Sequence, residues 1–457
     1  MSLIKSISGI RGTIGGQYND NLTALDIVEC TAAYAQLLKE NHDNPLVVLG
    51  RDGRISGKMV SSLVANTLVS MGCDVLDLGL STTPTVEMAV IGKKAQAGVI
   101  VTASHNPRHW NALKFLNEKG EFISAQIGQT ILDYIKESNL NFATVDDLGK
   151  YKKGSYFNEH IEAILQHDFV FVDKIKAANF HVVVDCINST GALSIPPLLD
   201  KLSVIYTLIN EEVNGDFAHN PEPKIEHLQD LSKAVTAHNA DMGIAVDPDV
   251  DRLAFMSSDG SMFGEEYTLV ALADFILSSK KGAVVNNLSS TQALRDIAEK
   301  HGVPYGSAAV GEVNVVNMMK EMNAIIGGEG NGGIIDPSLH YGRDALIGIA
   351  LMLSYLADSG KSMIEIKSEL PAYEMTKDKI DLEKGTDVDN ILKEVALIYK
   401  NQEVNTVDGV KIIFPGEWVH LRKSNTEPII RVYAESKDKN AAQSLASKVK
   451  SKIQQLM

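Results

Sequence analysis

The sequence predicts an α/β protein with three related α/β domains, followed by a smaller α+β domain at the C-terminus. Two observations support this class. Three times along the chain, a short apolar run leads into a polar loop, a helical stretch and a second apolar run. After about residue 368 the pattern changes to alternating polar and apolar residues. Strand, helix and strand in succession favour parallel sheets covered by helices, whereas alternation favours antiparallel strands.

The predicted elements follow from these runs. The first strand of each unit is expected at residues 45–49, 181–184 and 283–285, and the second strand at 75–78, 204–208 and 303–306. In the C-terminal region, antiparallel strands are expected at 410–414, 418–421 and 429–434. A polar helix containing several alanines is expected at 439–457.

Composition limits the class of function. The 457 residues are 44% hydrophobic and 22% charged, which is typical of a globular protein with several cores. No apolar stretch approaches the roughly 20 residues needed to cross a bilayer, and the first residues lack the apolar region of a signal peptide, so we expect a cytoplasmic protein. A net charge of −15 argues against nucleic-acid or anionic-membrane partners. The three cysteines, Cys30, Cys73 and Cys186, have no metal-binding or disulfide spacing and are predicted to be reduced.

Ser104 lies in the run Thr-Ala-Ser-His-Asn-Pro, directly after the strand-like residues 98–101. Pro107 has no backbone donor and favours an extended conformation at Asn106, so this loop should be stiff and should present Ser104 to a ligand. A serine and histidine beside Asn-Pro also occur in ordinary turns, where Asn bonds its own backbone. On this run alone, both interpretations stay open.

Three aspartates, Asp247, Asp249 and Asp251, follow a second apolar run at residues 242–246. Carboxylates at alternate positions of a short loop can direct their oxygens at one hard cation, and a set without His or Cys favours Mg²⁺ over zinc. The spacing is not that of an EF-hand. A solvated acidic turn is the alternative, but carboxylates this close repel one another unless positive charge lies between them. We therefore predict a magnesium site.

Two further segments suit a phosphate and a sugar. One collects guanidinium, ammonium, hydroxyl and amide groups near a turn: Arg422, Lys423, Ser424, Asn425, Thr426 and Arg431. In the other, the glycine-rich run 327–333, only Glu329 and Asn331 carry side chains, and these suit sugar hydroxyls. No Gly-Lys-Ser/Thr follows, so the run is not a Walker loop. With a nucleophile and a magnesium site, these segments indicate phosphoryl transfer.

In this order the four segments resemble the signatures of the α-D-phosphohexomutases, which include phosphoglucomutase, phosphomannomutase and phosphoglucosamine mutase. The runs at 102–107, 247–252, 328–332 and 422–428 are similar to the family's phosphoserine, magnesium, sugar-binding and phosphate-binding loops. Smaller matches are Asn111 and Lys114. Two short segments also match: 8–12, which contains Arg11, and 50–57, which contains Arg51 and Arg54. The resemblance covers the whole chain and implies an intramolecular phosphotransferase, classed as an isomerase.

The resemblance also implies the architecture. It predicts three related α/β domains with mixed sheets and a C-terminal α+β domain of TATA-binding-protein-like fold, placed around a central cleft. The expected spans are 1–151 for the phosphoserine loop, 152–252 for the metal-binding loop, 253–367 for the sugar-binding loop and 368–457 for the phosphate-binding loop.

For the chemistry, the resemblance implies a phosphoserine at Ser104 and a sugar 1,6-bisphosphate as intermediate and activator. Mg²⁺ is expected on Asp247, Asp249, Asp251 and a phosphoserine oxygen of Ser104. Lys114 and His105 are candidates for proton transfer, and Arg252 is expected to orient the phosphoryl oxygens. The predicted substrate-binding residues are Arg11, Glu329, Asn331, Arg422, Ser424, Asn425, Thr426 and Arg431. For His105 a purely structural role is the alternative, and for Arg11, Arg51 and Arg54 the alternative is an ordinary salt bridge, with Asp52 as a partner of one of them.

Departures from the family pattern bear on the substrate. Most members have Gly-Glu-x-Ser-Gly-His in the sugar loop, whereas this chain has Asn331 in place of Ser and Gly333 in place of His. A general acid/base at that His cannot operate here. Pro248 and Lys423 also depart from the pattern without removing a ligand oxygen or an arginine. The glycine-rich form, with residues 310–314, is most similar to phosphoglucosamine mutases, so we predict conversion of glucosamine 6-phosphate to glucosamine 1-phosphate.

Other functions stay as alternatives. Phosphoglucomutase or phosphomannomutase activity is the nearest one, because these hexoses differ only at C2. A magnesium phosphatase with an aspartyl nucleophile would explain the aspartates but would not need Ser104. A non-catalytic sugar-phosphate sensor would explain the missing histidine, although the nucleophile and metal loops are both intact. The expected partner is a small phosphosugar, with the chain a monomer or a homodimer.

Overall fold

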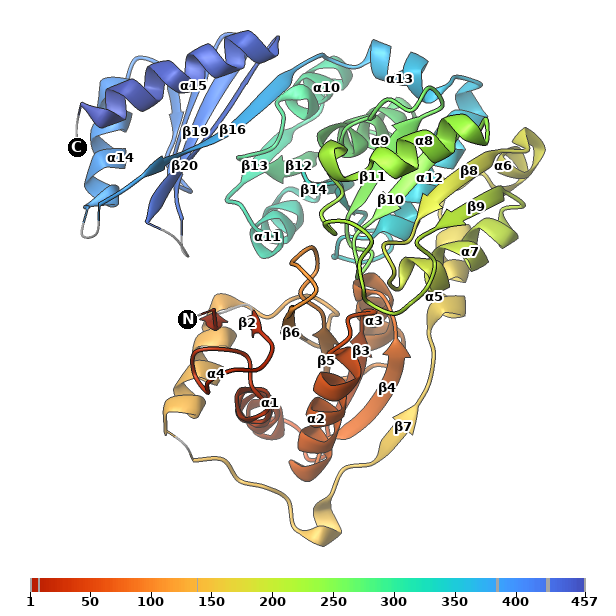
Figure 1. Cartoon of the computed structure of the whole chain (residues 1–457), viewed down its shortest axis with the longest axis vertical. Coiled ribbons are helices and arrows are strands. Elements are labelled where there is room, and N and C mark those ends of the chain that lie inside the picture. The colour runs from red at the N-terminus through yellow and green to blue at the C-terminus, as the bar shows by residue number, and fades with distance from the viewer. Residues whose placement is uncertain (1, 7–8, 138, 384–385, 425–427, 456–457) are drawn as a thin grey trace. The chain divides into compact units, whose positions relative to one another are not determined.

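The computed structural model describes residues 2–6, 9–137, 139–383, 386–424 and 428–455 (Figure 1). The chain forms two compact units. Unit 1 consists of residues 1–268 and 331–365, and unit 2 consists of residues 269–330 and 366–457. Two helices, α9 (Glu265–Ser279) and α13 (Met363–Glu369), begin in one unit and end in the other.

The first sheet of unit 1 has seven strands in the order β1-β2-β6-β5-β3-β4-β7. They are β1 (Ile4–Ser6), β2 (Gly9–Thr13), β3 (Leu46–Arg51), β4 (Asp74–Leu80), β5 (Ala97–Val101), β6 (Trp110–Leu116) and β7 (Tyr151–Lys153). β3 pairs in parallel with β4 and β5, whereas β6 pairs antiparallel with β5 and β2. The sheet is therefore mixed, with its parallel strands at the centre.

Helices cover both faces of this sheet (Figure 1). The helices around it are α1 (Ala24–Lys39), α2 (Gly57–Ser70), α3 (Thr83–Gly92) and α4 (Ala125–Glu137). Val47, Leu49 and Val99 belong to the core under α1, α2 and α4, while Val48 and Ile100 belong to the core under α3. Successive residues of a strand point to opposite faces, so a strand buried on both faces needs an unbroken apolar run. That run is the feature the sequence displays.

The second sheet of unit 1 has the order β11-β10-β8-β9. Its strands are β8 (His181–Asp185), β9 (Ile205–Ile209), β10 (Met242–Val246) and β11 (Leu253–Ser257). The other elements of this part are η1 (Val145–Asp147), α5 (Phe157–Leu165), α6 (Val172–Ala178), α7 (Gly191–Lys201), η2 (Ile225–His227), α8 (Gln229–Ala237), β15 (Gly333–Ile335) and α12 (Ala345–Ser359). α8 packs on β8, β10 and β11, and α12 contacts α5, α6, α7 and β11. β10 and β11 form an antiparallel hairpin, and its loop contains the three aspartates.

Unit 2 contains a parallel set of strands in the order β13-β12-β14. Its elements are β12 (Val284–Asn287), α10 (Ala293–His301), β13 (Tyr305–Ala308), α11 (Glu312–Met322) and β14 (Ile326–Glu329). α11 packs on all three strands. β14 ends at Glu329, so the predicted sugar-binding loop follows the end of a buried strand.

The C-terminal part of unit 2 is an antiparallel sheet in the order β16-β20-β19-β18-β17. Its elements are β16 (Glu374–Asp381), α14 (Val388–Ile398), β17 (Glu403–Asn405), β18 (Val410–Phe414), β19 (Glu417–Lys423), β20 (Ile429–Ser436) and α15 (Lys439–Gln454). Val419, Leu421, Ile430 and Val432 face the core that α14 and α15 cover (Figure 1). The intervening residues of β19 and β20 therefore lie on the other face of the sheet.

The predicted topology is confirmed. Each of the three expected strand pairs exists and is parallel, as β3 with β4, β8 with β9 and β12 with β13. The three C-terminal strands are antiparallel. The last helix ends at Gln454, so it is shorter than the predicted 439–457, and residues 456–457 lie outside the described part.

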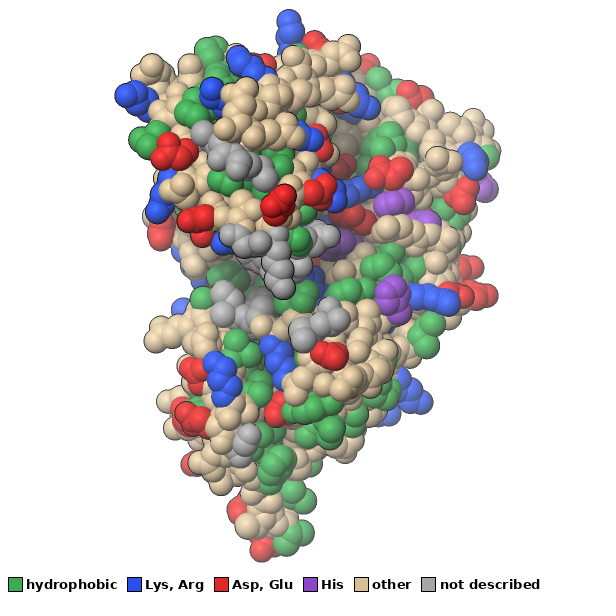
Figure 2. Space-filling view, turned by 60° about the vertical axis from the view of Figure 1, so that its left-hand side comes forward, with side chains coloured by type: hydrophobic (Ala, Val, Ile, Leu, Met, Phe, Trp, Pro, Cys, Tyr) green, Lys and Arg blue, Asp and Glu red, His purple; other side chains and the backbone are tan. Residues whose placement is uncertain are grey.

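Two expectations from composition can be compared with the structure. Cys30, Cys73 and Cys186 are free and buried, as predicted. Among the described residues, no helix combines the length and apolar character required to traverse a bilayer. Acidic and basic side chains are interspersed over the face shown in Figure 2, although the chain carries a net charge of −15.

Candidate active site

The carboxyl ends of β3 and β5 place two loops side by side in unit 1. The strands are parallel neighbours, so the loops that follow them emerge at the same edge of the sheet. Residues 52–56 follow β3, and residues 102–107 follow β5. This edge is where the sequence predicted a reactive serine.

Ser104 is buried and adopts a left-handed backbone conformation, with φ of 47°. Its backbone N–H donates to Thr102 Oγ1 over 2.9 Å, and the Thr102 hydroxyl donates in turn to Asp52 Oδ2 over 2.7 Å. Non-glycine residues rarely adopt this conformation unless the surroundings impose it. The loop therefore holds its serine in a strained position.

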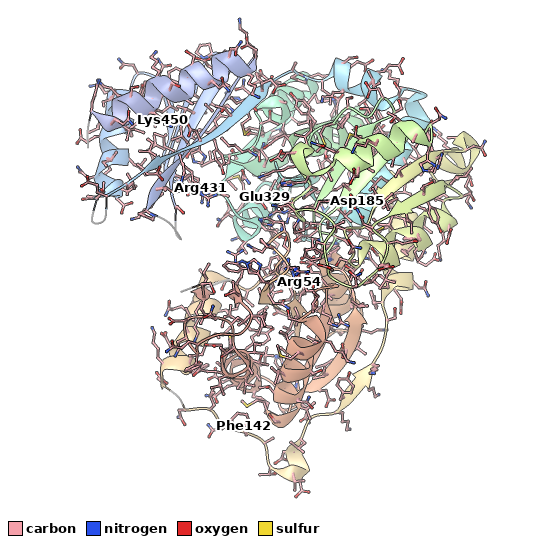
Figure 3. All side chains as sticks on the ribbon, viewed as in Figure 1. Arg54, Phe142, Asp185, Glu329, Arg431 and Lys450 are labelled. Atoms are coloured by element: carbon pink, nitrogen blue, oxygen red, sulfur yellow. The ribbon has the colours of Figure 1, made fainter. Side chains whose placement is uncertain are left out.

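Arg54, labelled in Figure 3, holds the same loop and is almost fully buried. Its guanidinium donates to the carbonyl oxygens of Ser104, Asn106, Pro107 and Trp110. Its Nε pairs with Asp52 Oδ2 at 3.0 Å. Arg54 therefore forms a salt bridge with Asp52, which is the alternative role that the sequence analysis gave it.

The three aspartates converge in the loop between β10 and β11. All three are fully buried, and one carboxylate oxygen from each lies within 4.8 Å of the others. Asp247 Oδ1 accepts hydrogen bonds from the N–H groups of Asp251 and Arg252, which fold the loop around it. Val250 has φ of 61°, an outlier for a β-branched residue, so this loop is strained as well.

The serine and the aspartates meet. Ser104 Oγ donates to Asp247 Oδ2 over 2.6 Å, and Lys114 Nζ lies 2.9 Å from Asp249 Oδ2 and 3.4 Å from Asp251 Oδ2. Loops that are 143 residues apart in sequence are thus in direct contact. Thr83, in the first turn of α3, adds a hydrogen bond of 2.6 Å to Asp249 Oδ2.

These residues suit a hard cation. The Oδ1 atoms of Asp249 and Asp251 are buried and, among the described residues, have no hydrogen-bond partner. Buried carboxylate oxygens are costly to leave unpaired, and oxygen donors without nitrogen or sulfur match Mg²⁺. The donor set and its unpaired oxygens therefore fit the predicted metal.

The charges at this site shift each other's ionisation. Burial, together with the charges of Asp249 and Asp251, raises the pKa of Asp247 well above its usual range. Burial opposes ionisation of Asp249 too, but the Lys114 ammonium and the Thr83 hydroxyl lower its pKa below the usual range. Lys114 has a raised pKa because Asp249 and Asp251 outweigh its burial. The lysine therefore keeps its proton.

Guanidinium groups also lie near the Ser104 loop. Arg11 donates to Asn106 Oδ1 over 3.3 Å, and burial and the charge of Arg252 lower the pKa of Arg11. His105 Nδ1 lies 3.3 Å from Ser104 Oγ, and burial and nearby guanidinium groups, Arg252 foremost, lower the pKa of His105 to about 2. The imidazole is therefore neutral. Guanidinium groups crowded around a buried hydroxyl form a site for an anion such as a phosphoryl group.

The predicted sugar-binding residues are divided between the two units. Glu329 belongs to unit 2, is buried, and accepts hydrogen bonds at Oε1 from Asn287 Nδ2 over 2.9 Å and from the Gly311 N–H over 3.2 Å (Figure 3). Asn331 belongs to unit 1, where its Oδ1 accepts from the Gly333 N–H. Each is fixed within its own unit.

Two of the predicted phosphate-binding residues, Arg422 and Arg431, lie on the sheet face away from α14 and α15. Arg422 on β19 is directly opposite Arg431 on β20 across the strand pair, and Arg431 is labelled in Figure 3. Asp408 pairs with Arg422 Nε at 2.8 Å and accepts from the Val310 N–H. Like charges opposite each other on a sheet are destabilising unless an anion lies between them. Ser424 follows β19, whereas Asn425 and Thr426 lie outside the described residues.

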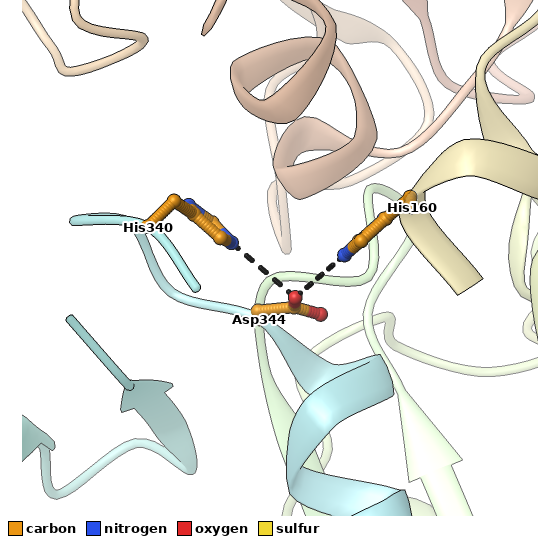
Figure 4. Close-up of side chains that lie close together, drawn as sticks. All are labelled: His160, His340 and Asp344. Atoms are coloured by element: carbon orange, nitrogen blue, oxygen red, sulfur yellow. Dashed lines mark hydrogen bonds and ion pairs between the residues drawn. The ribbon is translucent and has the colours of Figure 1, made fainter. Parts of the chain in front are cut away.

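A second cluster behind the metal loop also has metal-ligand chemistry. Asp344 Oδ2 lies 2.8 Å from His160 Nε2 and 3.3 Å from His340 Nε2 (Figure 4). The outer nitrogens face Thr85 Oγ1 at 3.0 Å and Glu87 Oε2 at 3.3 Å. All three ligand atoms are already engaged with one another, whereas the Oδ1 atoms of Asp249 and Asp251 have no partner among the described residues. We therefore interpret this cluster as a hydrogen-bonded network.

Sequence reasoning missed several residues that the structure brings to the site. Thr83 and Arg343 both bond the metal loop, and Asp408 holds Arg422. None lies in a segment with a recognisable pattern of its own. Their roles depend on chain folding that brings α3 and the start of α12 against the loop after β10. Arg343 follows the glycine-rich run by ten residues, and this proximity was the one signal in the sequence that could have indicated it.

Four family models match the chain in order. They are described as phosphoglucomutase/phosphomannomutase α/β/α domain I at residues 3–141, domain II at 158–260, domain III at 264–373, and the C-terminal domain at 378–452. A phosphoglucomutase/phosphomannomutase from Thermococcus kodakarensis is 35% identical over 94% of this chain and 95% of its own length. The chain belongs to the phosphoglucomutase/phosphomannomutase family of the α-D-phosphohexomutases.

Other members of the family differ in the substrate that their names state. A phosphoglucosamine/phosphogalactosamine mutase from Sulfurisphaera tokodaii is 32% identical over 98% of this chain and 99% of its own length. A crystal structure of a family protein from Burkholderia thailandensis matches with a TM-score of 0.84 over 98% of this chain and 97% of that chain. The Paramecium phosphoglucomutase parafusin matches with 0.80 over 99% and 95%. At 24% and 16% identity these structures show the fold. This phosphohexomutase is therefore an isomerase of the phosphotransferring kind.

Proposed function

We propose that this phosphohexomutase moves phosphate between C6 and C1 of a hexose through a phosphoserine at Ser104, and that its preferred substrate is glucosamine 6-phosphate. The observation that carries the proposal is the hydrogen bond of 2.6 Å from Ser104 Oγ to Asp247 Oδ2. It joins the predicted nucleophile to the predicted metal loop at a site rimmed by guanidinium groups. Phosphoryl transfer requires this combination of positioning and charge neutralisation.

In this mechanism Ser104 carries the phosphoryl group of the resting enzyme. Arg11 and Arg252 bind its oxygens, and Lys114 supplies a fixed positive charge rather than a base, because Asp249 and Asp251 keep it protonated. Asp247, Asp249 and Asp251 would hold a Mg²⁺ ion, which would neutralise charge on the phosphoryl group. His105, neutral and next to Ser104, is the proton acceptor that we assign, because the negative charge of the phosphoryl group would offset the burial and the guanidinium groups that lower its pKa to about 2.

The substrate phosphate binds to the two facing arginines of unit 2, Arg422 and Arg431, together with Ser424, Asn425 and Thr426. The free hydroxyl of the sugar takes the phosphoryl group from Ser104. The resulting sugar 1,6-bisphosphate turns over and returns its other phosphate to the serine. Because the enzyme is left phosphorylated, the net result is migration of phosphate within one sugar, and added bisphosphate activates any enzyme that has lost its phosphate.

Glucosamine specificity is supported by the glycine-rich loop that contains Glu329 and Asn331 and by the names of several relatives. Phosphoglucosamine mutases are among the proteins that share about a third of their residues with this chain. A carboxylate such as that of Glu329 is suited to pair with an amine. The four domain spans, the cytoplasmic location and the choice between monomer and homodimer stay predictions.

The substrate proposal is tested by phosphorus NMR of the protein with Mg²⁺, a trace of hexose bisphosphate, and equal amounts of glucosamine 6-phosphate and glucose 6-phosphate. We expect the amino sugar to be converted to its 1-phosphate first, because only its C2 amine can pair with a carboxylate. Faster conversion of glucose 6-phosphate would contradict the glucosamine proposal and favour phosphoglucomutase/phosphomannomutase activity.

The same spectra test the reaction class. Release of inorganic phosphate without any 1-phosphate would contradict a mutase and favour a phosphatase. Ser104→Ala is the matched control, because it abolishes a phosphoserine mutase but leaves a phosphatase with an aspartyl nucleophile active.

A further inference from the structure

Gly333, the last residue of the glycine-rich run 327–333, has no room for a side chain. A Cβ atom added to it would lie 2.9 Å from Arg343 Cγ and closer still to Arg343 Cδ. Its backbone φ is outside the left-handed region, so conformation does not require glycine here. The requirement comes from the space that Arg343 occupies.

The adjacent glycine has a different reason. Gly332 has φ of +81°, and a Cβ atom there would lie 2.8 Å from the backbone carbon of Leu253 and closer still to its oxygen. Both its conformation and a neighbouring backbone exclude a side chain. Of the two glycines, only Gly333 is constrained mainly by a side chain.

Arg343 extends from this point into the metal loop. Its Nη2 donates to Asp251 Oδ2 over 2.7 Å, and its side chain is 8% exposed. Lys114 Nζ lies 3.4 Å from the same oxygen, so two cations hold one oxygen of Asp251 while the other, Oδ1, has no hydrogen-bond partner among the described residues. The carboxylate is thereby oriented with one oxygen tied and one available.

The backbone of Arg343 is anchored on both sides. The N–H of Asp344 donates to the Ile334 carbonyl over 2.8 Å, and the N–H of Ala345 donates to the Val250 carbonyl over 3.2 Å. The Asp344 carboxylate caps the first turn of α12 and is held by the two histidines of Figure 4. Arg343 is therefore fixed between the glycine-rich run and the metal loop.

We propose that Gly333 and Arg343 form a matched pair. Arg343 is a positioning residue that holds Asp251 for the reaction, and residue 333 is glycine because a side chain there would collide with Arg343. A guanidinium does not release its proton, so this position contributes fixed charge and geometry instead of proton transfer. The role of Asp251 in phosphoryl transfer rests on the proposed function. The steric pairing of Gly333 with Arg343 does not.

The test is a double-mutant cycle of Gly333→Ala, Arg343→Ala and the double variant, with kcat and KM measured at saturating Mg²⁺. We expect Arg343→Ala to lower kcat on the order of tenfold to a hundredfold, the range for loss of a charge-assisted hydrogen bond, with KM for the sugar phosphate nearly unchanged. Gly333→Ala should lower kcat similarly because it displaces Arg343. The double variant should be no slower than Arg343→Ala alone. Arg343→Lys, which keeps the charge, should recover part of kcat.

Additive losses in the cycle, or an Arg343→Ala variant with the kcat of the original protein, would overturn the proposal. Thermal unfolding of the same variants tests the steric pairing without any activity measurement. A failure of the pairing can therefore be distinguished from a failure of the proposed function. Gly333→Ala should lower Tm when Arg343 is present and should not when Arg343 is replaced by Ala. If Gly333→Ala does not fold, recovery of folding in the double variant is the expected result, and its absence contradicts the pairing.

Gly332→Ala is the matched control. Its obstacle is the backbone of Leu253, so removing the Arg343 side chain should not relieve it. If Arg343→Ala relieves both glycine variants equally, the effect is a general loosening of the loop and the specific pairing is wrong.

Discussion

At the scale of single residues, the site depends on two strained backbone positions. Ser104 and Val250 both have positive φ, and they lie in the two loops that meet at the hydrogen bond from Ser104 to Asp247. Such conformations persist only where the surroundings over-determine them. For Ser104 the surroundings are Thr102, Asp52 and the Arg54 guanidinium, which binds four carbonyl groups of the loop.

Arg54→Ala should therefore destabilise the protein strongly. The substitution leaves Asp52 as a buried carboxylate without its cation, which costs about 3–5 kcal/mol of unfolding free energy. Chemical denaturation measures this loss. Arg108→Ala is the control, because Arg108 pairs with Asp216 on the surface, where both side chains are more than half exposed and pairs contribute about 0–1 kcal/mol. Equal losses for the two variants would show that Arg54 does not hold the loop.

At the scale of elements, three helices of unit 1 meet behind the metal loop. Thr83 at the start of α3 bonds Asp249, and Ala345 at the start of α12 bonds Val250. A network joins them: Asp344, the N-cap of α12, lies between His160 from α5 and His340 (Figure 4), and Glu87 from α3 pairs with His340. Burial alone would lower the pKa of His340, but the carboxylates of Asp344 and Glu87 raise it to about 10.

This shift predicts a pH-dependent stability. The folded pKa of His340 lies above the unfolded value of about 6.5, so its contribution is complete below about pH 6.5 and is lost as the pH rises towards about 10. His340→Gln should therefore destabilise the protein more near pH 6 than near pH 10. Denaturation midpoints at both pH values measure the difference, with the exposed His42→Gln as control. A loss that is the same at both pH values would mean that His340 is uncharged in the folded protein.

The burial of each strand determines which features of the fold and site are visible in the sequence. β3, β5 and β10 are buried on both faces, so their apolar runs were visible, and the loops after β5 and β10 carried the serine and the aspartates. Arg343 and Thr83 were not predictable in the same way. They act at the starts of α12 and α3, and nothing in a linear pattern indicates that two helix starts dock on a loop of another sheet.

At the scale of the whole molecule, the chain carries a net charge of −15 yet is predicted to bind an anion. Its cations are concentrated locally instead. Unit 1 places Arg11, Arg252, Lys114 and Arg343 around Ser104 and the aspartates, and unit 2 places Arg422 opposite Arg431. Each unit thus presents its own basic group of side chains suited to a phosphate.

The central claim is that Ser104 carries the phosphoryl group that the sugar receives. The most direct measurement labels that phosphoryl group by incubating the protein with labelled hexose 1,6-bisphosphate, removes the free sugar, and then adds unlabelled glucosamine 6-phosphate with Mg²⁺. The account predicts that the label resides on Ser104, is absent from Ser104→Ala, and moves to the added sugar within a turnover. Label that stays on the protein, or leaves only as inorganic phosphate, would contradict it.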